Sequence, residues 1–409
     1  MKKSIQVLFF SLGILLATNF YTNAQVPVDT SEIIRISNMG DVTLLKQQIL
    51  PIQIWSDMIL IKAKVNGIEG YFVWDNGFAF SALDKNFAAK IKLSPLQQKT
   101  DIAGTDGNNA QISMQCELGR VDMGQVSISG SPFTIIDFEA MMGKHVKPVG
   151  IIGSTVIKKI NWKFDFDKNT VTLSLKPFES NGIKLPFEID AYNNSKILFG
   201  LNGYLDKAAI DFGYNGNEVA IPKDALPIFG AAKKSISIGH LSSSVSGLSD
   251  RDTSYIFRDF KYCIGDTNTV LPHKFEIMLS SNRNHVLIGN RFFRNYNCII
   301  NNTSGQIILT TRKSPINVIP EKKYGAILSV NDGKILVSSF SDNPNINRNA
   351  DLKLMDEIES INGKSLKDFA DPSQIRDYQI SLLLKNMEMK LKRIDGKIFV
   401  FTPEPDIYK

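Results

Sequence analysis

Two aspartates, each followed two positions later by glycine, occupy corresponding places in two similar stretches of the chain. The first stretch reads VNGIEGYFVWDNG and ends at Gly77, and the second reads LNGYLDKAAIDFG and ends at Gly213. We call the offset that places Asp75 on Asp211, 211 − 75 = 136, the repeat shift. A repeat that offers one carboxylate per copy predicts a site at a pseudo-twofold axis, where the two aspartates face each other.

Facing carboxyl groups support a particular acid–base chemistry. Two carboxylates a hydrogen bond apart cannot both ionise cheaply, so the pair holds one proton between them. One member can then activate a water while the other donates a proton to a carbonyl oxygen under attack. In one copy alone, aspartate before glycine would be ordinary turn chemistry. Its recurrence at a fixed shift favours a dyad formed by Asp75 and Asp211.

The repeat shift aligns residues far beyond the two motifs. Ile152-Gly153 falls on Ile288-Gly289, and Leu173 falls on Leu309. The separation from aspartate to the later glycine is identical in both copies, 153 − 75 = 289 − 211 = 78. Register held over such a length predicts an internal duplication. We expect the two Ile-Gly pairs to lie on core strands behind the dyad.

The beginning of the chain has the pattern of a cleavable export signal. Lys2 and Lys3 precede an apolar run from Val7 to Ala17, and small residues follow near the end of residues 1–24. The run is shorter than the roughly 20 residues that a membrane span needs. We therefore expect an exported protein, periplasmic or secreted, with no membrane span after cleavage. Without the two lysines the net charge is 45 − 41 = +4, which gives no indication of nucleic-acid binding.

Cysteine and histidine give little sign of metal or redox chemistry. Cys116, Cys263 and Cys298 allow at most one disulfide, between the last two, and buried free thiols are the favoured alternative. The four histidines have no metal-ligand spacing, so we expect no metal and no cofactor. The segment Asp165–Asn169 resembles the start of a calcium loop but lacks the glycine and the distal glutamate. It predicts a hairpin turn.

Short alternating apolar runs separated by Gly, Asn, Asp and Ser indicate strands and tight turns. Short helices are expected after the two Ile-Gly pairs, from Ser154 and Asn290, and a longer one in PSQIRDYQISLLLKN. The predicted fold class is mostly β. Two β-barrel-like lobes related by a pseudo-twofold axis would cover residues 45–178 and 179–313, and a small α+β unit would cover residues 320–405.

A glycine-rich hairpin is a candidate substrate contact. Gly104, Thr105, Asp106 and Gly107 fall opposite His240-Leu241-Ser242-Ser243 under the repeat shift. Such a hairpin can close over a substrate as a flap. An exposed loop without a role is an alternative, at least as good for the second copy.

These residues resemble a known enzyme family over roughly residues 45–312. GYFVWDNG and KAAIDFG stand where pepsin-like and retropepsin-like aspartic peptidases have their Asp-Thr/Ser-Gly motifs, and IIGSTVIKKI and LIGNRFFRNY stand where the family has its later strand and short helix. The resemblance implies two acid-protease-type lobes, catalytic Asp75 and Asp211, and a peptide or protein substrate. It also implies substrate contacts at Gly77, Gly213 and the 104–107 hairpin.

The last unit resembles a bacterial PDZ domain. The segment LMDEIESINGKSL matches the family's core strand and turn. This resemblance implies that Tyr324, Gly325 and Ala326 form a loop for the carboxylate of a C-terminal peptide ligand. The alternative is a unit that packs on the second lobe and meets no ligand.

The sequence departs from the peptidase pattern beside both aspartates. The family has Thr or Ser there, whose hydroxyl joins a network between the two active loops, but this chain has Asn76 and Phe212. Asparagine can donate and accept hydrogen bonds, whereas phenylalanine can do neither. Phe78 and Tyr214 follow the glycines and would fill the water site or reshape the pocket. Two hypotheses stay open: an exported aspartic endopeptidase, and an inactive pseudopeptidase that binds extended peptides.

Overall fold

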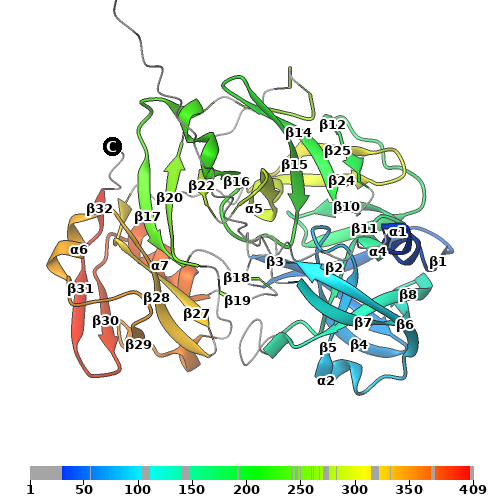
Figure 1. The fold of residues 1–409 in the computed structure, drawn as a ribbon, viewed down its shortest axis with the longest axis horizontal. Helices are drawn as coiled ribbons and strands as arrows, with labels where there is room; N and C mark the ends of the chain where they lie inside the picture. Colours follow the sequence, from blue (N-terminus) through cyan, green and yellow to red (C-terminus); the bar gives the residue numbers. More distant parts are fainter. Residues whose placement is uncertain are drawn as a thin grey trace, which may run out of the picture.

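The computed structural model describes residues 30–405 with internal gaps. The gaps are positions 56, 104–110, 140–146, 191–192, 241–242, 245–246, 249, 259, 261, 267, 270–275, 282, 315–321, 332 and 370–373. The predicted signal segment, residues 1–24, lies outside the described residues. The molecule is mostly β, as predicted, and in Figure 1 three parts are visible: blue to cyan, green to yellow, and orange to red.

We refer to residues 45–178 as the first copy, 179–313 as the second copy and 320–405 as the C-terminal unit. Two elements precede the first copy: α1 (Thr30–Ser37) and β1 (Asp41–Leu44). The first copy contains β2 (Gln48–Trp55), β3 (Met58–Val65), β4 (Ile68–Trp74), β5 (Ser81–Asp84), α2 (Lys85–Ala88), β6 (Ser94–Ala103), β7 (Gln111–Met123), β8 (Val126–Ile136), β9 (Gly150–Ile152), α4 (Ser154–Ile157), β10 (Asn161–Asp165) and β11 (Thr170–Ser174).

The second copy has a similar order of elements, with additional short strands. It contains β12 (Ile183–Pro186), β13 (Glu188–Ile189), β14 (Ser195–Leu201), β15 (Tyr204–Asp211), β16 (Val219–Pro222), the 3₁₀ helix η1 (Lys223–Phe229), β17 (Ser235–Gly239), β18 (Ser243–Ser244), β19 (Gly247–Leu248), β20 (Asp252–Phe257), β21 (Tyr262–Ile264), β22 (Ile277–Ser280), β23 (Leu287–Gly289), α5 (Asn290–Phe293), β24 (Tyr296–Asn301) and β25 (Gln306–Thr311).

The C-terminal unit mixes strands and helices. It contains β26 (Lys322–Lys323), β27 (Ala326–Asn331), β28 (Lys334–Ser341), α6 (Pro344–Arg348), β29 (Glu357–Ile361), the 3₁₀ helix η2 (Leu366–Asp368), α7 (Gln374–Leu384), β30 (Met389–Arg393), β31 (Ile398–Phe401) and β32 (Glu404–Pro405). The helices expected from Ser154, from Asn290 and in the 372–386 segment are all present, and the turn after Asp165 joins β10 to β11 in a hairpin, as predicted. Within the described residues, no helix is both long and apolar enough to cross a bilayer.

Corresponding turns and strand pairings recur in both copies. The β3–β4 hairpin turns at Asn66-Gly67 and the β14–β15 hairpin at Asn202-Gly203, and all four residues have positive φ. Asn-Gly is favoured there because both residues tolerate the left-handed conformation of a tight hairpin turn. Each hairpin leads its second strand into a parallel pairing, β4 with β9 and β15 with β23. The two aspartates are thereby delivered to equivalent strand ends.

A continuous sheet joins the two copies where β10 pairs antiparallel with β24. Lys163 lies opposite Ile299, its own counterpart under the repeat shift (163 + 136 = 299). Trp162 pairs with Ile300, and the shift converts that pair into the neighbouring one, Phe164 with Cys298 (162 + 136 = 298, 164 + 136 = 300). A register that maps onto itself in this way places a local pseudo-twofold axis between the two strands.

The C-terminal unit has its own apolar core and attaches to the second copy through a strand. Its buried residues include Leu328, Val337 and Phe401. Strand β28 pairs antiparallel with β17, with Ser341 opposite Ser237. The repeat shift places β17 on the end of β6, the strand that enters the glycine-rich hairpin of the first copy. The corresponding strand of the second copy therefore holds the C-terminal unit.

A cluster of charged groups also joins all three parts. Asp57, in the β2–β3 turn, forms salt bridges with Arg294 at 2.9 Å and with Arg376 of α7 at 3.3 Å. Arg376 also donates to the backbone oxygen of Asn215, which lies shortly after Asp211 in the chain. Arg294 is 7% exposed, whereas the Arg376 side chain is 43% exposed. The two bridges should therefore differ in strength.

We predict that Asp57→Ala lowers the free energy of unfolding by about 3–5 kcal/mol, because it leaves the buried Arg294 charge without its partner. Arg376→Ala should cost about 1 kcal/mol or less, since its bridge is half-exposed. Urea unfolding of both variants measures the difference. Equal losses in the two variants would contradict this assignment of the Asp57 cluster.

Candidate functional site

Each aspartate is held by the turn that follows it. The backbone N–H groups of Gly77 and Phe78 donate to Asp75 Oδ1 at 2.9 and 3.1 Å. The N–H groups of Gly213 and Tyr214 donate to Oδ1 of Asp211 at 2.8 and 3.0 Å. The sequence repeat is thus reproduced as a repeat of hydrogen bonds. Backbone donors of the following turn thus hold one oxygen of each carboxyl group.

Each carboxyl group lies against the glycine of the other copy. A Cβ placed on Gly77 would lie 2.3 Å from Cγ of Asp211, and one on Gly213 would lie 2.2 Å from Cγ of Asp75. No side chain fits at either position, which gives a physical reason for both glycines. The two carboxyl groups consequently face each other and share a side-chain hydrogen bond. Two aspartates from opposite copies meet as the sequence predicted.

Burial raises the pKa of both carboxyl groups, and each is opposed by backbone donors. Burial and the charge of Asp211 hold the pKa of Asp75 well above its usual value, against the lowering effect of the N–H groups of Gly77 and Phe78. Burial also raises the pKa of Asp211, but the N–H groups of Tyr214 and Gly213 and the charge of Arg283 oppose that rise. Two carboxyl groups this close share one proton and titrate as a coupled pair.

Asn76 makes two hydrogen bonds at the position where the peptidase pattern has a hydroxyl. Its side chain is buried at 3% exposure; Nδ2 donates to the backbone oxygen of Ile210 at 3.0 Å, and Oδ1 accepts from the backbone N–H of Phe212 at 2.9 Å. Both bonds run to the residues that flank Asp211. The side chain of Asn76 thus ties the loop of the first copy to that of the second.

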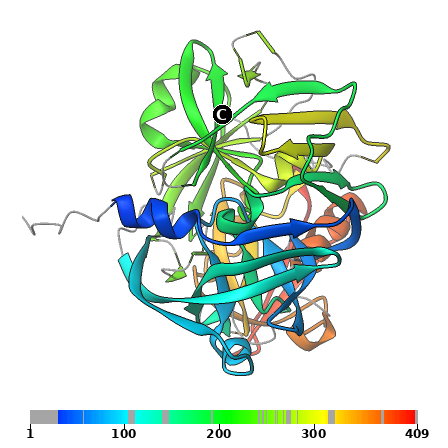
Figure 2. The ribbon, with the colours of Figure 1, turned by 90° about the vertical axis from the view of Figure 1, so that its right-hand side faces the viewer.

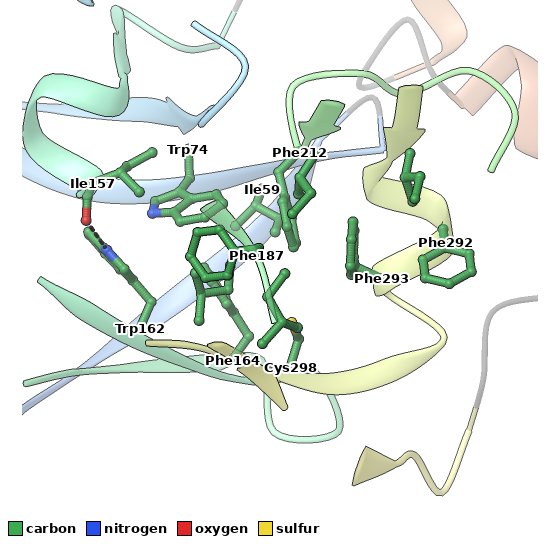
Figure 3. Packing of buried hydrophobic residues seen from close by; sticks show 14 of the residues in the cluster. Ile59, Trp74, Ile157, Trp162, Phe164, Phe187, Phe212, Phe292, Phe293 and Cys298 are labelled. Carbon is green, nitrogen blue, oxygen red and sulfur yellow. Dashed lines mark hydrogen bonds between the residues drawn. The ribbon is translucent and has the colours of Figure 1, made fainter. Parts of the chain in front are cut away.

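The Phe212 side chain makes no such hydrogen bond and packs instead into an aromatic cluster (Figure 3). Its ring stacks on Phe293 with centroids 4.7 Å apart and meets Trp74 edge to face at 5.0 Å. Phe164 stacks on the same ring at 6.1 Å. Trp74 and Phe164 come from the first copy and Phe293 from the second. At this position, apolar contact between the copies replaces the hydroxyl network.

Phe78 and Tyr214 occupy equivalent positions (78 + 136 = 214) and pack into apolar clusters on either side. Phe78 packs against a cluster that includes Phe138 of the first copy, and Tyr214 against one that includes Met278 of the second. Asp75 stays partly exposed and Asp211 is 8% exposed. The sequence left open whether these side chains fill the water site or reshape the pocket, and these contacts favour a reshaped pocket.

Arg283 belongs to this site but was not predicted from the sequence. Its guanidinium lies 4.8 Å from the centroid of the Tyr214 ring, and its charge lowers the pKa of Asp211. Arg283 is far from Asp211 in the chain, and no short motif includes it. Only the fold brings it close.

The other predicted site residues stand as follows. The hairpin tip at Gly104, Thr105, Asp106 and Gly107 lies outside the described residues, but β6 and β7 that lead to it are paired up to Ala103 opposite Gln111. Tyr324 is buried, and its hydroxyl donates to the backbone oxygen of Met387 at 2.6 Å. Gly325 has a φ of +86°, and Ala326 begins β27. Peptide binding at these positions stays a prediction.

Cys263 and Cys298 are free thiols, so the possible disulfide between them is absent, and the favoured alternative of a buried free thiol is confirmed for Cys298. Cys298 is buried, which raises the pKa of its thiol, and Cys263 is partly exposed. The side chain of Cys116 lies outside the described ones. Within the described ranges, no three His, Cys, Asp or Glu side chains gather in a cluster that could hold a metal ion.

Comparison with known proteins adds one finding. Residues 61–156 match the aspartyl protease family model. The matched region contains Asp75, Asn76 and the Ile152-Gly153 strand, and it supports a protease-type function. No curated protein matches the chain significantly.

We predict that Asn76→Ala lowers the free energy of unfolding by about 2–4 kcal/mol, because it leaves a buried N–H and a buried carbonyl without partners. Asn76→Thr should lose less, since a hydroxyl can still donate one bond and accept another. Urea unfolding measures both variants, with Gln47→Ala as an exposed-amide control. Equal stability of Asn76→Ala and the control would rule out the bridging role.

Proposed function

We propose that this protein is an aspartic endopeptidase in which Asp75 and Asp211 form the catalytic dyad. The observation that carries the proposal is the reciprocal placement of each carboxyl group against the other copy's glycine, which brings the pair within a hydrogen bond. The match of residues 61–156 to the aspartyl protease family supports the same assignment. The partial exposure of Asp75 leaves the pair accessible from one side.

We assign the shared proton to Asp75, whose pKa is held well above its usual value, and the negative charge to Asp211, whose pKa is lowered by the charge of Arg283. Ionised Asp211 accepts a proton from a water held between the carboxyl groups, while the water oxygen attacks the scissile carbonyl carbon. Asp75 donates its proton to the carbonyl oxygen, which gives a neutral gem-diol. The proton on Asp211 then passes to the amide nitrogen as the C–N bond breaks, and a diol proton returns to Asp75. The cycle balances without a metal or a cofactor.

The remaining parts of the proposal concern substrate and location. The substrate is an extended peptide segment that contacts Gly77, Gly213 and the hairpin at 104–107.

We further propose two acid-protease-type lobes, and a PDZ-like C-terminal unit whose Tyr324–Ala326 loop binds a peptide carboxylate. Among the described residues, β27 pairs only with β28, which supports addition of a peptide strand along its other edge. Export, to the periplasm or beyond the cell, follows from the pattern of residues 1–24.

The test is cleavage of a diverse peptide library between about pH 3 and 8, the span over which a coupled carboxyl pair can titrate. Mass spectrometry identifies the products. We expect cuts with the wild-type protein and none with Asp75→Asn or Asp211→Asn, while the exposed Asp224→Asn variant keeps full activity. Residual cleavage in both dyad variants would contradict the mechanism. Peptide binding without turnover in the folded wild type would favour the pseudopeptidase instead.

We also predict a shift of the acid limb of the pH profile in Arg283→Met. Loss of the guanidinium charge raises the pKa of Asp211, because that charge stabilises the ionised carboxylate. Activity needs Asp211 ionised, so its loss on acidification should begin at a higher pH than in the wild type. The rate of cleavage against pH measures this limb. An unchanged acid limb would exclude Arg283 as a determinant of the dyad's charge.

A further inference from the structure

A cavity of about 460 Å³ lies beside α1. In Figure 1, α1 lies on the side of the molecule away from the C-terminal unit. It is lined by side chains of α1 and Asn38, by Lys158 and Lys159 after α4, and by residues of the turn before β14. Figure 2, turned by 90°, also shows α1 at the junction of the two copies. The volume is in the range of small-ligand sites.

The pseudo-twofold relates this cavity to the Asp57 cluster. The repeat shift aligns Asp57 with Asn193 (57 + 136 = 193) and Lys158 with Arg294 (158 + 136 = 294). Both turn residues have positive φ, 59° for Asp57 and 67° for Asn193. Lys158 Nζ donates to Asn193 Oδ1 at 2.6 Å, as Arg294 donates to Asp57 Oδ1 at 2.9 Å. The same contact is thus made twice, once with a carboxylate and once with an amide.

The exchange of aspartate for asparagine leaves positive charge in the cavity. Lys158 Nζ bonds to the amide oxygens of Asn38 and Asn193, and Lys159 Nζ bonds to the backbone oxygen of Asn38. Within the described residues, neither lysine forms a salt bridge. Asp190 also lines the cavity, but its carboxylate accepts hydrogen bonds from Asn194.

The ammonium groups of two lysines are the cationic part of the cavity wall. The Nδ2 of Asn193, a residue that is 5% exposed, has no hydrogen-bond partner among the described residues but is closed to solvent, so it adds no donor that a ligand in the cavity reaches. The cavity therefore offers the Nζ atoms of Lys158 and Lys159. An anion with acceptor oxygens complements these two groups.

We propose that this cavity binds a carboxylate ligand, whose negative charge offsets that of the lysines as the Asp57 carboxylate offsets that of Arg294 in the other copy. Nζ of Lys158 and Nζ of Lys159 are its donors. The ligand is either a free small carboxylate or an acidic side chain of a peptide. The site is separate from the Asp75–Asp211 dyad and does not depend on its activity.

The electrostatics of Lys158 are consistent with a place left open for an anion. Burial lowers the pKa of Lys158 to about 8, and the charge of Lys159 adds to that effect. Burial also lowers the pKa of Lys159, opposed by the charge of Asp41. Lys158 still carries its proton at pH 7, and a bound carboxylate would raise its pKa again.

The first experiment measures the unfolding temperature of the full protein at pH 7 and constant ionic strength with two acidic probes. One is glutarate, and the other is acetyl-Ala-Glu-Ala-amide, with the Gln peptide as its neutral match. We expect an acidic probe to raise the unfolding temperature. A rise in the unfolding temperature with glutarate, whether or not the Glu peptide also produces one, identifies a free carboxylate ligand. A rise with the Glu peptide and not with glutarate identifies an acidic side chain. No rise with either probe, or a rise with inorganic phosphate only, would overturn the proposal.

Two variants locate the effect. Asn193→Asp supplies the missing carboxylate within the chain, so it should raise the unfolding temperature without a probe and abolish the response to one. Lys158→Met should weaken probe binding at least tenfold, whereas the exposed Lys176→Met should not change it. Equal responses in wild type, Asn193→Asp and Lys158→Met would place the effect elsewhere and overturn the proposal. Cleavage activity should be the same in all of them.

The rate of chemical modification of Lys158 tests binding at this cavity directly. At pH 7.5 an amine-acylating reagent should modify Lys158 faster than exposed lysines, because its pKa is lowered to about 8. The acidic probe that raises the unfolding temperature should slow that reaction at Lys158 and not at Lys176. Modification of Lys158 at the same rate with and without that probe would contradict binding at this cavity.

Discussion

The packing of two carboxyl groups against two glycines is the constraint on which the rest of the structure depends. Each aspartate lies where the other copy's glycine has no side chain, so neither copy can form the pair alone. Burying two acids side by side is unfavourable, and the surroundings offset that cost. Four backbone N–H groups, the Asn76 bridge and the aromatic packing of Phe212 all hold the two loops at this separation. The shared sheet of β10 and β24 sets the axis about which they meet.

The duplicated frame carries unequal side chains at equivalent positions. Beside the dyad, Asn76 makes hydrogen bonds in both directions, and Phe212 contributes apolar contact. At the two turns, Asp57 joins three parts of the molecule, whereas Asn193 offers Lys158 an amide in place of a carboxylate. These residues lie at positions that the repeat shift relates, and their exchange gives the two positions different contacts. Arg283 adds a further difference, because its charge lowers the pKa of Asp211.

The repeat allowed much of this arrangement to be predicted from sequence. A constant shift identified the aspartates, the glycines, the Ile-Gly strands and the short helices, because each is set by local turn and strand chemistry. Long-range contacts left no such signal. The pairing of β17 with β28, the salt bridge from Arg376 to Asp57 and the approach of Arg283 to Asp211 join distant segments without a motif. Asn76 departs from the peptidase pattern, and only the geometry shows that its amide bonds to the backbone of both Ile210 and Phe212.

The most direct test of the shared proton is carboxyl-carbon NMR of the protein with labelled aspartate, followed from about pH 2 to 9. Single Asp→Asn variants assign the signals of Asp75 and Asp211. The account predicts two coupled titration steps, one of them well above the usual range of aspartate near 4, and a simpler single step in each variant. Two independent titrations near pH 4, unchanged when the partner is replaced, would contradict a dyad that holds one proton.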